Sequence, residues 1–110
     1  MDPSWTDVLA ATDLDDDAVV GVDVKGLDIA VYSVGGSLYA TDNICTHGAA
    51  LLCDGFLEGH EIECPMHQGR FDVRTGAAMS GPVSEGLRTY PIRIEAGRIL
   101  LALPEAGTHR

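Results

Sequence analysis

Two short segments of this chain carry residue types that bind metals. Cys45-Thr46-His47 is followed, after sixteen intervening residues, by Cys64-Pro65-Met66-His67. Each segment offers one thiolate sulfur and one imidazole nitrogen from a short stretch of chain. Four soft or borderline ligands in two matched pairs predict a metal centre.

The spacing within each pair bears on the kind of metal. Zinc would accept the same four ligands, so the residue types alone leave zinc open. Structural zinc sites, however, usually draw their ligands from Cys-x2-4-Cys or His-x3-5-His segments. A Cys and a His one residue apart leave an extended chain on the same side, and a tight loop can aim them at two different atoms. This spacing favours a binuclear cluster over a single ion.

Both segments resemble the cluster loops of the Rieske family. The resemblance rests on Cys45-Thr46-His47-Gly48 and Cys64-Pro65-Met66-His67-Gln68-Gly69, and residues 42–103 are similar to the Rieske ferredoxins of bacterial aromatic-ring dioxygenase systems, the naphthalene type in particular. It implies a Rieske-type [2Fe-2S] cluster as the cofactor. The ligands implied for the iron that stays ferric are Cys45 and Cys64, and those for the iron that becomes ferrous are His47 and His67.

The resemblance also implies a function, that of a one-electron carrier rather than an enzyme. Such a carrier takes electrons from an NAD(P)H-dependent flavoprotein reductase and passes them singly to a terminal ring-hydroxylating oxygenase. The sequence lacks the glycine-rich dinucleotide fingerprint of a reductase. It also lacks the length and the two-His-one-carboxylate set of a mononuclear iron oxygenase domain. We expect a monomer in isolation.

Three other functions stay open on the sequence alone. The first is a Rieske-like small subunit bound permanently to another oxidoreductase, of the nitrite or arsenite type. The second is a zinc-stabilised interaction module without redox activity. The third is a regulatory redox sensor, for which the sequence offers neither a DNA-binding element nor a basic face.

Composition and charge limit which binding partners and which cellular compartment we expect for this protein. Seven basic and seventeen acidic residues among 110 give a formal net charge of −10, which disfavours nucleic acid and anionic membranes and favours basic patches on proteins. We expect a cytoplasmic protein, because the start of the chain has no basic segment followed by an apolar run and no apolar stretch approaches a membrane span of about 20 residues. Three cysteines without such a signal also suit a reducing compartment.

Several residues receive plainer predictions. Cys53 matches no ligand position and is expected to be a half-buried free thiol. His60 and His109 are expected to face solvent. The acidic run from Asp13 to Asp17 predicts a solvated turn between strands.

The remaining pattern predicts an all-β fold, a Rieske-type antiparallel sandwich or small barrel formed by one domain over residues 1–110. Segments 19–24 and 27–34 flank Lys25-Gly26, Gly35-Gly36 leads into residues 37–41, and segments 90–95 and 98–103 flank Ala96-Gly97. Each arrangement predicts a hairpin. Residues 6–14 could instead form a turn of helix.

The glycine-rich stretch from about residue 42 to 83 holds every proposed ligand. We interpret it as a cluster-binding subdomain inserted in the β framework. Residues 60–63 predict a strand leading into the second ligand loop, and residues 70–73 a strand leaving it. The Gly81-Pro82 loop resembles the loop that closes over the cluster in Rieske proteins.

Substitutions around the ligand loops predict a low reduction potential. Rieske proteins of respiratory chains carry a disulfide between loop positions that match Ala50 and Met66, and hydroxyl donors at positions that match Gly69 and Phe71. Without donors to the cluster sulfurs the reduced state is less stabilised, so the midpoint should lie near the lower end of the Rieske range, about −150 mV. A redox titration checks this, and a clearly positive midpoint would contradict it.

Overall fold

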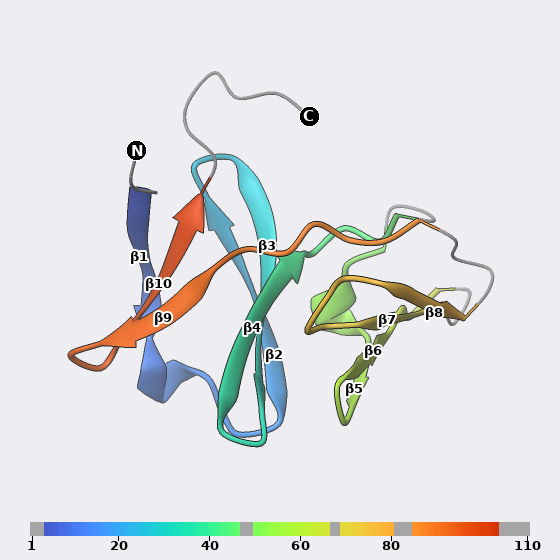
Figure 1. Cartoon of the computed structure of the whole chain (residues 1–110), viewed down its shortest axis with the longest axis horizontal. Helices are drawn as coiled ribbons and strands as arrows, with labels where there is room; N and C mark the ends of the chain where they lie inside the picture. The colour runs from blue at the N-terminus through green and yellow to red at the C-terminus, as the bar shows by residue number, and fades with distance from the viewer. Residues whose placement is uncertain (1–3, 47–49, 67–68, 81–84, 104–110) are drawn as a thin grey trace.

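The computed structural model describes residues 4–46, 50–66, 69–80 and 85–103, and the regular secondary structure in this part of the chain consists of antiparallel strands and short 3-10 turns (Figure 1). The predicted all-β class is confirmed. No helix in these ranges is long and apolar enough to cross a membrane. In chain order the elements are β1 (Ser4–Ala10), η1 (Ala11–Asp13), β2 (Ala18–Val24), β3 (Leu27–Val34), β4 (Ser37–Asp42), η2 (Leu52–Asp54), β5 (Phe56–Glu58), β6 (Glu61–Glu63), β7 (Arg70–Asp72), β8 (Ala78–Ser80), β9 (Ile92–Glu95) and β10 (Arg98–Leu103).

The strands form three sheets, with the orders β1-β10-β9, β2-β3-β4 and β5-β6-β7-β8. The two three-stranded sheets, which we call the framework, lie together, and the four-stranded sheet lies to one side of them (Figure 1). The chain returns from the four-stranded sheet along β4: the Tyr90 N–H donates to the Ala40 carbonyl at 3.0 Å, and the Asp42 N–H donates to the Arg88 carbonyl at 2.9 Å. Residues 85–91, which we call the return segment, thus join the three sheets.

Turn chemistry explains why the predicted hairpins form. Both central residues of each two-residue turn have positive φ: 53° and 83° at Lys25-Gly26, 58° and 86° at Gly35-Gly36, and 51° and 77° at Ala96-Gly97. Such pairs match the right-handed twist of the flanking strands. The three hairpins predicted from these dipeptides are confirmed.

The N-terminal segment is mostly extended, so the helical alternative for residues 6–14 is wrong except for the short turn η1. Pairing with β10 explains this, because the ladder runs from Ser4 opposite Leu103 to Ala10 opposite Arg98. The acidic run that follows is a turn as predicted. Asp15, Asp16 and Asp17 are exposed.

Strand β3 separates two hydrophobic cores. Ile29 and Val31 face the framework core, which includes Ile99 and Leu101 of β10. Ala30, Tyr32 and Val34 face a second core, which is shared with the four-stranded sheet and with Cys45 and Cys64. Burial on both faces explains why this strand is almost continuously apolar in sequence instead of alternating.

Candidate metal centre

The two predicted cysteine ligands lie together in the second core. Cys45 is 3% exposed and Cys64 is 1% exposed, and neither forms a disulfide. Burial is the main cause that raises the pKa of the Cys64 thiol; a hydrogen bond from the Met66 backbone opposes the shift, and a side-chain hydrogen bond with Cys45 adds to it. Two adjacent thiols that are shielded from water form a sulfur donor pair of the kind that iron clusters use.

Each cysteine begins a short loop, and the same kind of hydrogen bond closes both loops. The Cys45 N–H donates to the Ala50 carbonyl at 2.9 Å, and the Cys64 N–H donates to the Gly69 carbonyl at 2.8 Å. The predicted ligands His47 and His67 belong to these loops by sequence and lie outside the described residues. The structure therefore brings the two predicted thiols together, while the imidazole pair stays a prediction.

The second loop rises from the β6–β7 hairpin, in agreement with the strands predicted on either side of it. Glu63 precedes the loop and Arg70 follows it, and their side chains form an ion pair at 2.9 Å. Arg70 also contacts Glu58 at 3.2 Å and Glu61 at 3.3 Å. These pairs are partly exposed, so they set local geometry more than they add stability.

The first loop is held by a backbone bridge and by a side-chain hydrogen bond to the return segment. Ile44 bridges to Leu51, and the Thr46 hydroxyl donates to the Glu85 carbonyl at 2.8 Å, which ties this loop to the return segment. Sequence reasoning missed Asn43, a residue only 1% exposed at the base of the loop. The one feature of the sequence that could have indicated this residue is its amide side chain, two positions before the proposed ligand Cys45.

Other predicted positions have mixed outcomes. Phe71 is fully buried behind the cysteines. Cys53 is a half-buried free thiol, as predicted.

His60 is half-buried rather than facing solvent, because its ring packs edge-on against Tyr39 with the ring centroids 5.9 Å apart. His109 and the Gly81-Pro82 loop lie outside the described residues.

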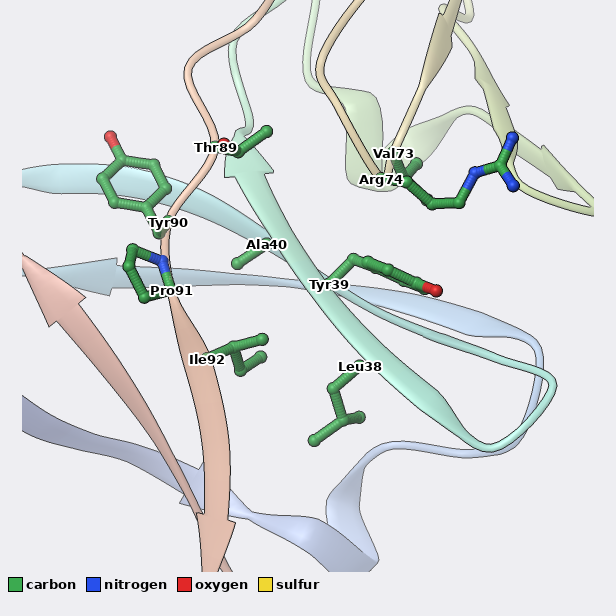
Figure 2. A pocket seen from close by; sticks show the side chains of 9 residues that line it. All are labelled: Leu38, Tyr39, Ala40, Val73, Arg74, Thr89, Tyr90, Pro91 and Ile92. Atoms are coloured by element: carbon green, nitrogen blue, oxygen red, sulfur yellow. The ribbon is translucent and has the colours of Figure 1, made fainter.

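A cavity of about 270 Å³ marks the junction between the framework and the four-stranded sheet (Figure 2). β4 and the return segment line it on the framework side, while Val73 and Arg74 lie across from Tyr39. The Tyr90 ring extends away from Tyr39, and its hydroxyl donates to the Asp42 carboxylate. Burial first, and the hydrogen bond with this carboxylate second, raise the pKa of Tyr90 to about 12. This bond ties the return segment to the residue where the first ligand loop leaves β4.

Residues 4–91 match the model of the Rieske [2Fe-2S] domain. The chain belongs to the Rieske [2Fe-2S] family. Its cofactor is accordingly a Rieske-type [2Fe-2S] cluster, which binds through two cysteines on one iron and two histidines on the other. The buried, adjacent and unpaired thiols of Cys45 and Cys64, each at the start of a closed loop, fit the sulfur half of that ligand set.

Individual Rieske proteins match this chain over nearly its whole length. The ferredoxin component of the naphthalene 1,2-dioxygenase system of Pseudomonas aeruginosa is 52% identical over 103 residues, which cover 94% of this chain and 99% of that protein. The structure of a Sphingomonas yanoikuyae B1 ferredoxin has a TM-score of 0.87 at 39% identity, covering 92% and 100% of the two chains. A chain from the complex of reduced oxygenase and oxidized ferredoxin in carbazole 1,9a-dioxygenase has a TM-score of 0.85 at 38% identity, covering 92% and 94%.

Gly76 fixes the return segment against this Rieske site. Its carbonyl accepts a hydrogen bond from the Leu87 N–H at 2.7 Å, and Leu87 is buried in the second core beside the cysteines. Gly76 has φ of +80°, and a Cβ placed on it would lie 2.1 Å from the Leu87 carbonyl oxygen. Only glycine fits there without movement of one backbone against the other.

We expect Gly76→Ala to destabilise the fold much more than Gly26→Ala. Gly26 has nearly the same φ, +83°, but nothing lies within 4 Å of its added Cβ. Gly26→Ala should therefore show only the backbone cost, about 1–2 kcal/mol, and Gly76→Ala a further 3 kcal/mol or so from the clash. Urea unfolding followed by circular dichroism measures both, and equal losses would contradict the role given to Gly76.

Proposed function

We propose that this chain is the ferredoxin component of an aromatic-ring-hydroxylating dioxygenase system. In this role it carries single electrons from an NAD(P)H-dependent flavoprotein reductase to a terminal Rieske oxygenase. The observation that carries the proposal is the near full-length match to the naphthalene dioxygenase ferredoxin component, because the two proteins share essentially the same extent of chain. The compartment we propose is the cytoplasm, which suits the unpaired thiols of Cys45, Cys53 and Cys64.

The proposed ligand set is Cys45 and Cys64 for one iron and His47 and His67 for the other. When bound, the cluster supplies the ability to accept and release one electron at a time. The protein places the two thiols in a core closed by Leu52, Ile62 and Phe71, which keeps water away from the sulfur side. We further propose that residues 42–83 form the cluster-binding unit within a single domain of residues 1–110.

Exposed apolar side chains beside the ligand loops support a docking role for that end of the molecule. Ile44, next to Cys45, is 50% exposed, and Met66, between Cys64 and His67 in sequence, is 53% exposed. Apolar side chains at the centre of an interface exclude water and carry much of the binding energy. The net charge of −10 adds attraction to basic protein surfaces, which weakens as salt rises.

Removing a proposed cysteine ligand should abolish cluster binding. We expect Cys45→Ala and Cys64→Ala to lose most of the bound iron, because each leaves an iron one ligand short. Cys53→Ala is the matched control and should keep wild-type iron, since Cys53 matches no ligand position. Iron content per chain and the electron paramagnetic resonance spectrum after dithionite reduction give the readout. A Cys64→Ala protein with the wild-type rhombic signal would exclude the proposed ligand set.

Truncating the apolar side chains beside the loops should slow electron transfer to the oxygenase. We expect the double variant Ile44→Ala/Met66→Ala to lower the second-order rate about tenfold, equivalent to about 1.4 kcal/mol of lost contact. Ile94→Ala is the control, because Ile94 is also 53% exposed but lies on β9 of the framework. Stopped-flow mixing of the reduced protein with the oxygenase of a naphthalene dioxygenase system measures the rates.

The midpoint potentials of the three proteins are measured in parallel, so that a change in driving force is not mistaken for a change in docking. Equal slowing by Ile94→Ala, or no slowing by the double variant, would place the docking surface elsewhere on the molecule.

A further inference from the structure

Asn43 uses every polar group of its backbone and side chain at the base of the first ligand loop. Its backbone N–H donates to the Asp28 carbonyl at 2.9 Å, and its carbonyl accepts from the Leu52 N–H at 2.7 Å. Its side-chain Nδ2 donates to Asp28 Oδ1 at 2.9 Å and to Cys53 Sγ at 3.3 Å, while Oδ1 accepts from the Cys53 N–H at 2.8 Å. A residue that is 1% exposed and fully hydrogen-bonded has one conformation available.

These bonds connect three parts of the chain that are distant in sequence. Asp28 belongs to β3 of the framework, whereas Leu52 and Cys53 belong to η2, where the first loop ends. Asn43 thus ties the start of the loop both to its end and to the framework. The next residue, Ile44, bridges to Leu51, and the Cys45 N–H donates to the Ala50 carbonyl at 2.9 Å. The position of Asn43 therefore fixes the position of the loop that begins at Cys45.

The framework leaves room for this arrangement at Gly21 of β2. A Cβ there would lie 2.9 Å from Cys53 Sγ and 3.0 Å from Asn43 Nδ2. The backbone of Gly21 is not in the positive-φ region, so glycine is needed here for close approach and not for its conformation. The Asn43 amide therefore packs against β2 and forms a hydrogen bond with β3.

The second ligand loop is held by the β6–β7 hairpin of another sheet, and only the end of the first loop reaches that sheet, through β5, which follows η2 and pairs with β6. Cys64 follows β6, and its N–H donates to the Gly69 carbonyl at 2.8 Å within the β6–β7 hairpin. The distance between the two thiols therefore depends on how the first loop is placed on the framework. Metal ligands must lie within about 0.2 Å of their required distances, so a small shift of the first loop alters or weakens the site.

We propose that Asn43, anchored by Asp28, is the positioning residue that sets Cys45 against Cys64 for cluster binding. The inference rests on the proposed function, since it concerns the same cluster site. The chemistry of the amide explains the residue type. One planar group on a short stem donates to a carboxylate and a sulfur while it accepts from a backbone N–H. An aspartate in its place would lose both donors and set a second carboxylate against Asp28.

The test compares Asn43→Asp with the exchange variant Asn43→Asp/Asp28→Asn. The exchange keeps the net charge of the wild type and restores a donor on residue 28 opposite an acceptor on residue 43. We expect Asn43→Asp to release iron to a chelator at least about tenfold faster than wild type, as loss of outer contacts to metal ligands commonly does. Its reduced-state resonance spectrum should broaden and its midpoint shift. The exchange variant should recover most of the wild-type values.

Two controls separate positioning from general stability and from the thiol. Ile99→Ala removes a side chain that is 1% exposed in the framework core, so it should lower the unfolding midpoint while the spectrum and potential stay unchanged. Cys53→Ala removes only the sulfur contact and leaves the bonds of Asn43 to Asp28 and to the backbone. Its iron release should be slower than that of Asn43→Asp, because only one contact of the amide is lost, and release as fast as in Asn43→Asp would overturn the role given to Asp28.

The outcomes that overturn the proposal are distinct from failure of the proposed function. If the wild-type protein binds no cluster, the proposed function fails before any variant is compared. If it binds one, the positioning role is overturned by a wild-type spectrum and release rate in Asn43→Asp, by no recovery in the exchange variant, or by equally fast release from Ile99→Ala. Should Asn43→Asp not fold, Gly21→Ala decides, because its Cβ would press on both Asn43 Nδ2 and Cys53 Sγ without changing charge, and Cys53→Ala shows the share of the sulfur contact. Faster release supports the proposal and an unchanged rate overturns it.

Discussion

Burial of β3 on both faces is the constraint on which the rest of the structure depends. Every residue from Ile29 to Val34 is buried, with alternate side chains in the framework core and in the core behind the cysteines. The core that holds the cysteines is therefore shared between the framework and the four-stranded sheet. The core around the cysteines includes Tyr32, a fully buried residue of the framework. The packing that stabilises the framework therefore also fixes the side chains against which the cysteines lie.

Both ligand loops are fixed at their bases, but by different contacts. Each is closed by a hydrogen bond from its cysteine N–H, and each has a polar clamp at its base. The clamp of the second loop is the Glu63–Arg70 ion pair, which solvent reaches, while that of the first loop is the buried amide of Asn43. A buried clamp cannot exchange its partners for water, so its loss leaves unsatisfied groups, whereas the exposed pair can be replaced by solvent.

The features that sequence predicted correctly are the local ones. Hairpins at Lys25-Gly26 and Ala96-Gly97 follow from the φ values that their own residues tolerate, and the metal centre follows from ligand types at short spacing. Asn43 and Gly76 could not be found in this way, because their roles depend on Asp28 and Leu87, whose positions only the folded chain supplies. The error at His60 has the same origin: the turn that holds it packs against Tyr39 of another strand.

The distribution of charge separates the two requirements of a carrier, which must meet its partner quickly and leave it quickly. Arginines in the described part of the chain are largely engaged by acidic neighbours, as in the pairs of Arg70, Arg74, Arg93 and Arg98. Their positive charge is thereby neutralised locally, and the excess of acidic residues sets the field that a partner meets. That field acts over about 8–10 Å at moderate salt and raises the rate of encounter. In the proposed docking role, the apolar side chains of Ile44 and Met66 beside the ligand loops act only at contact, after the field has brought the partner near. Small contact areas are typical of short-lived electron-transfer complexes, which repeated one-electron transfers require.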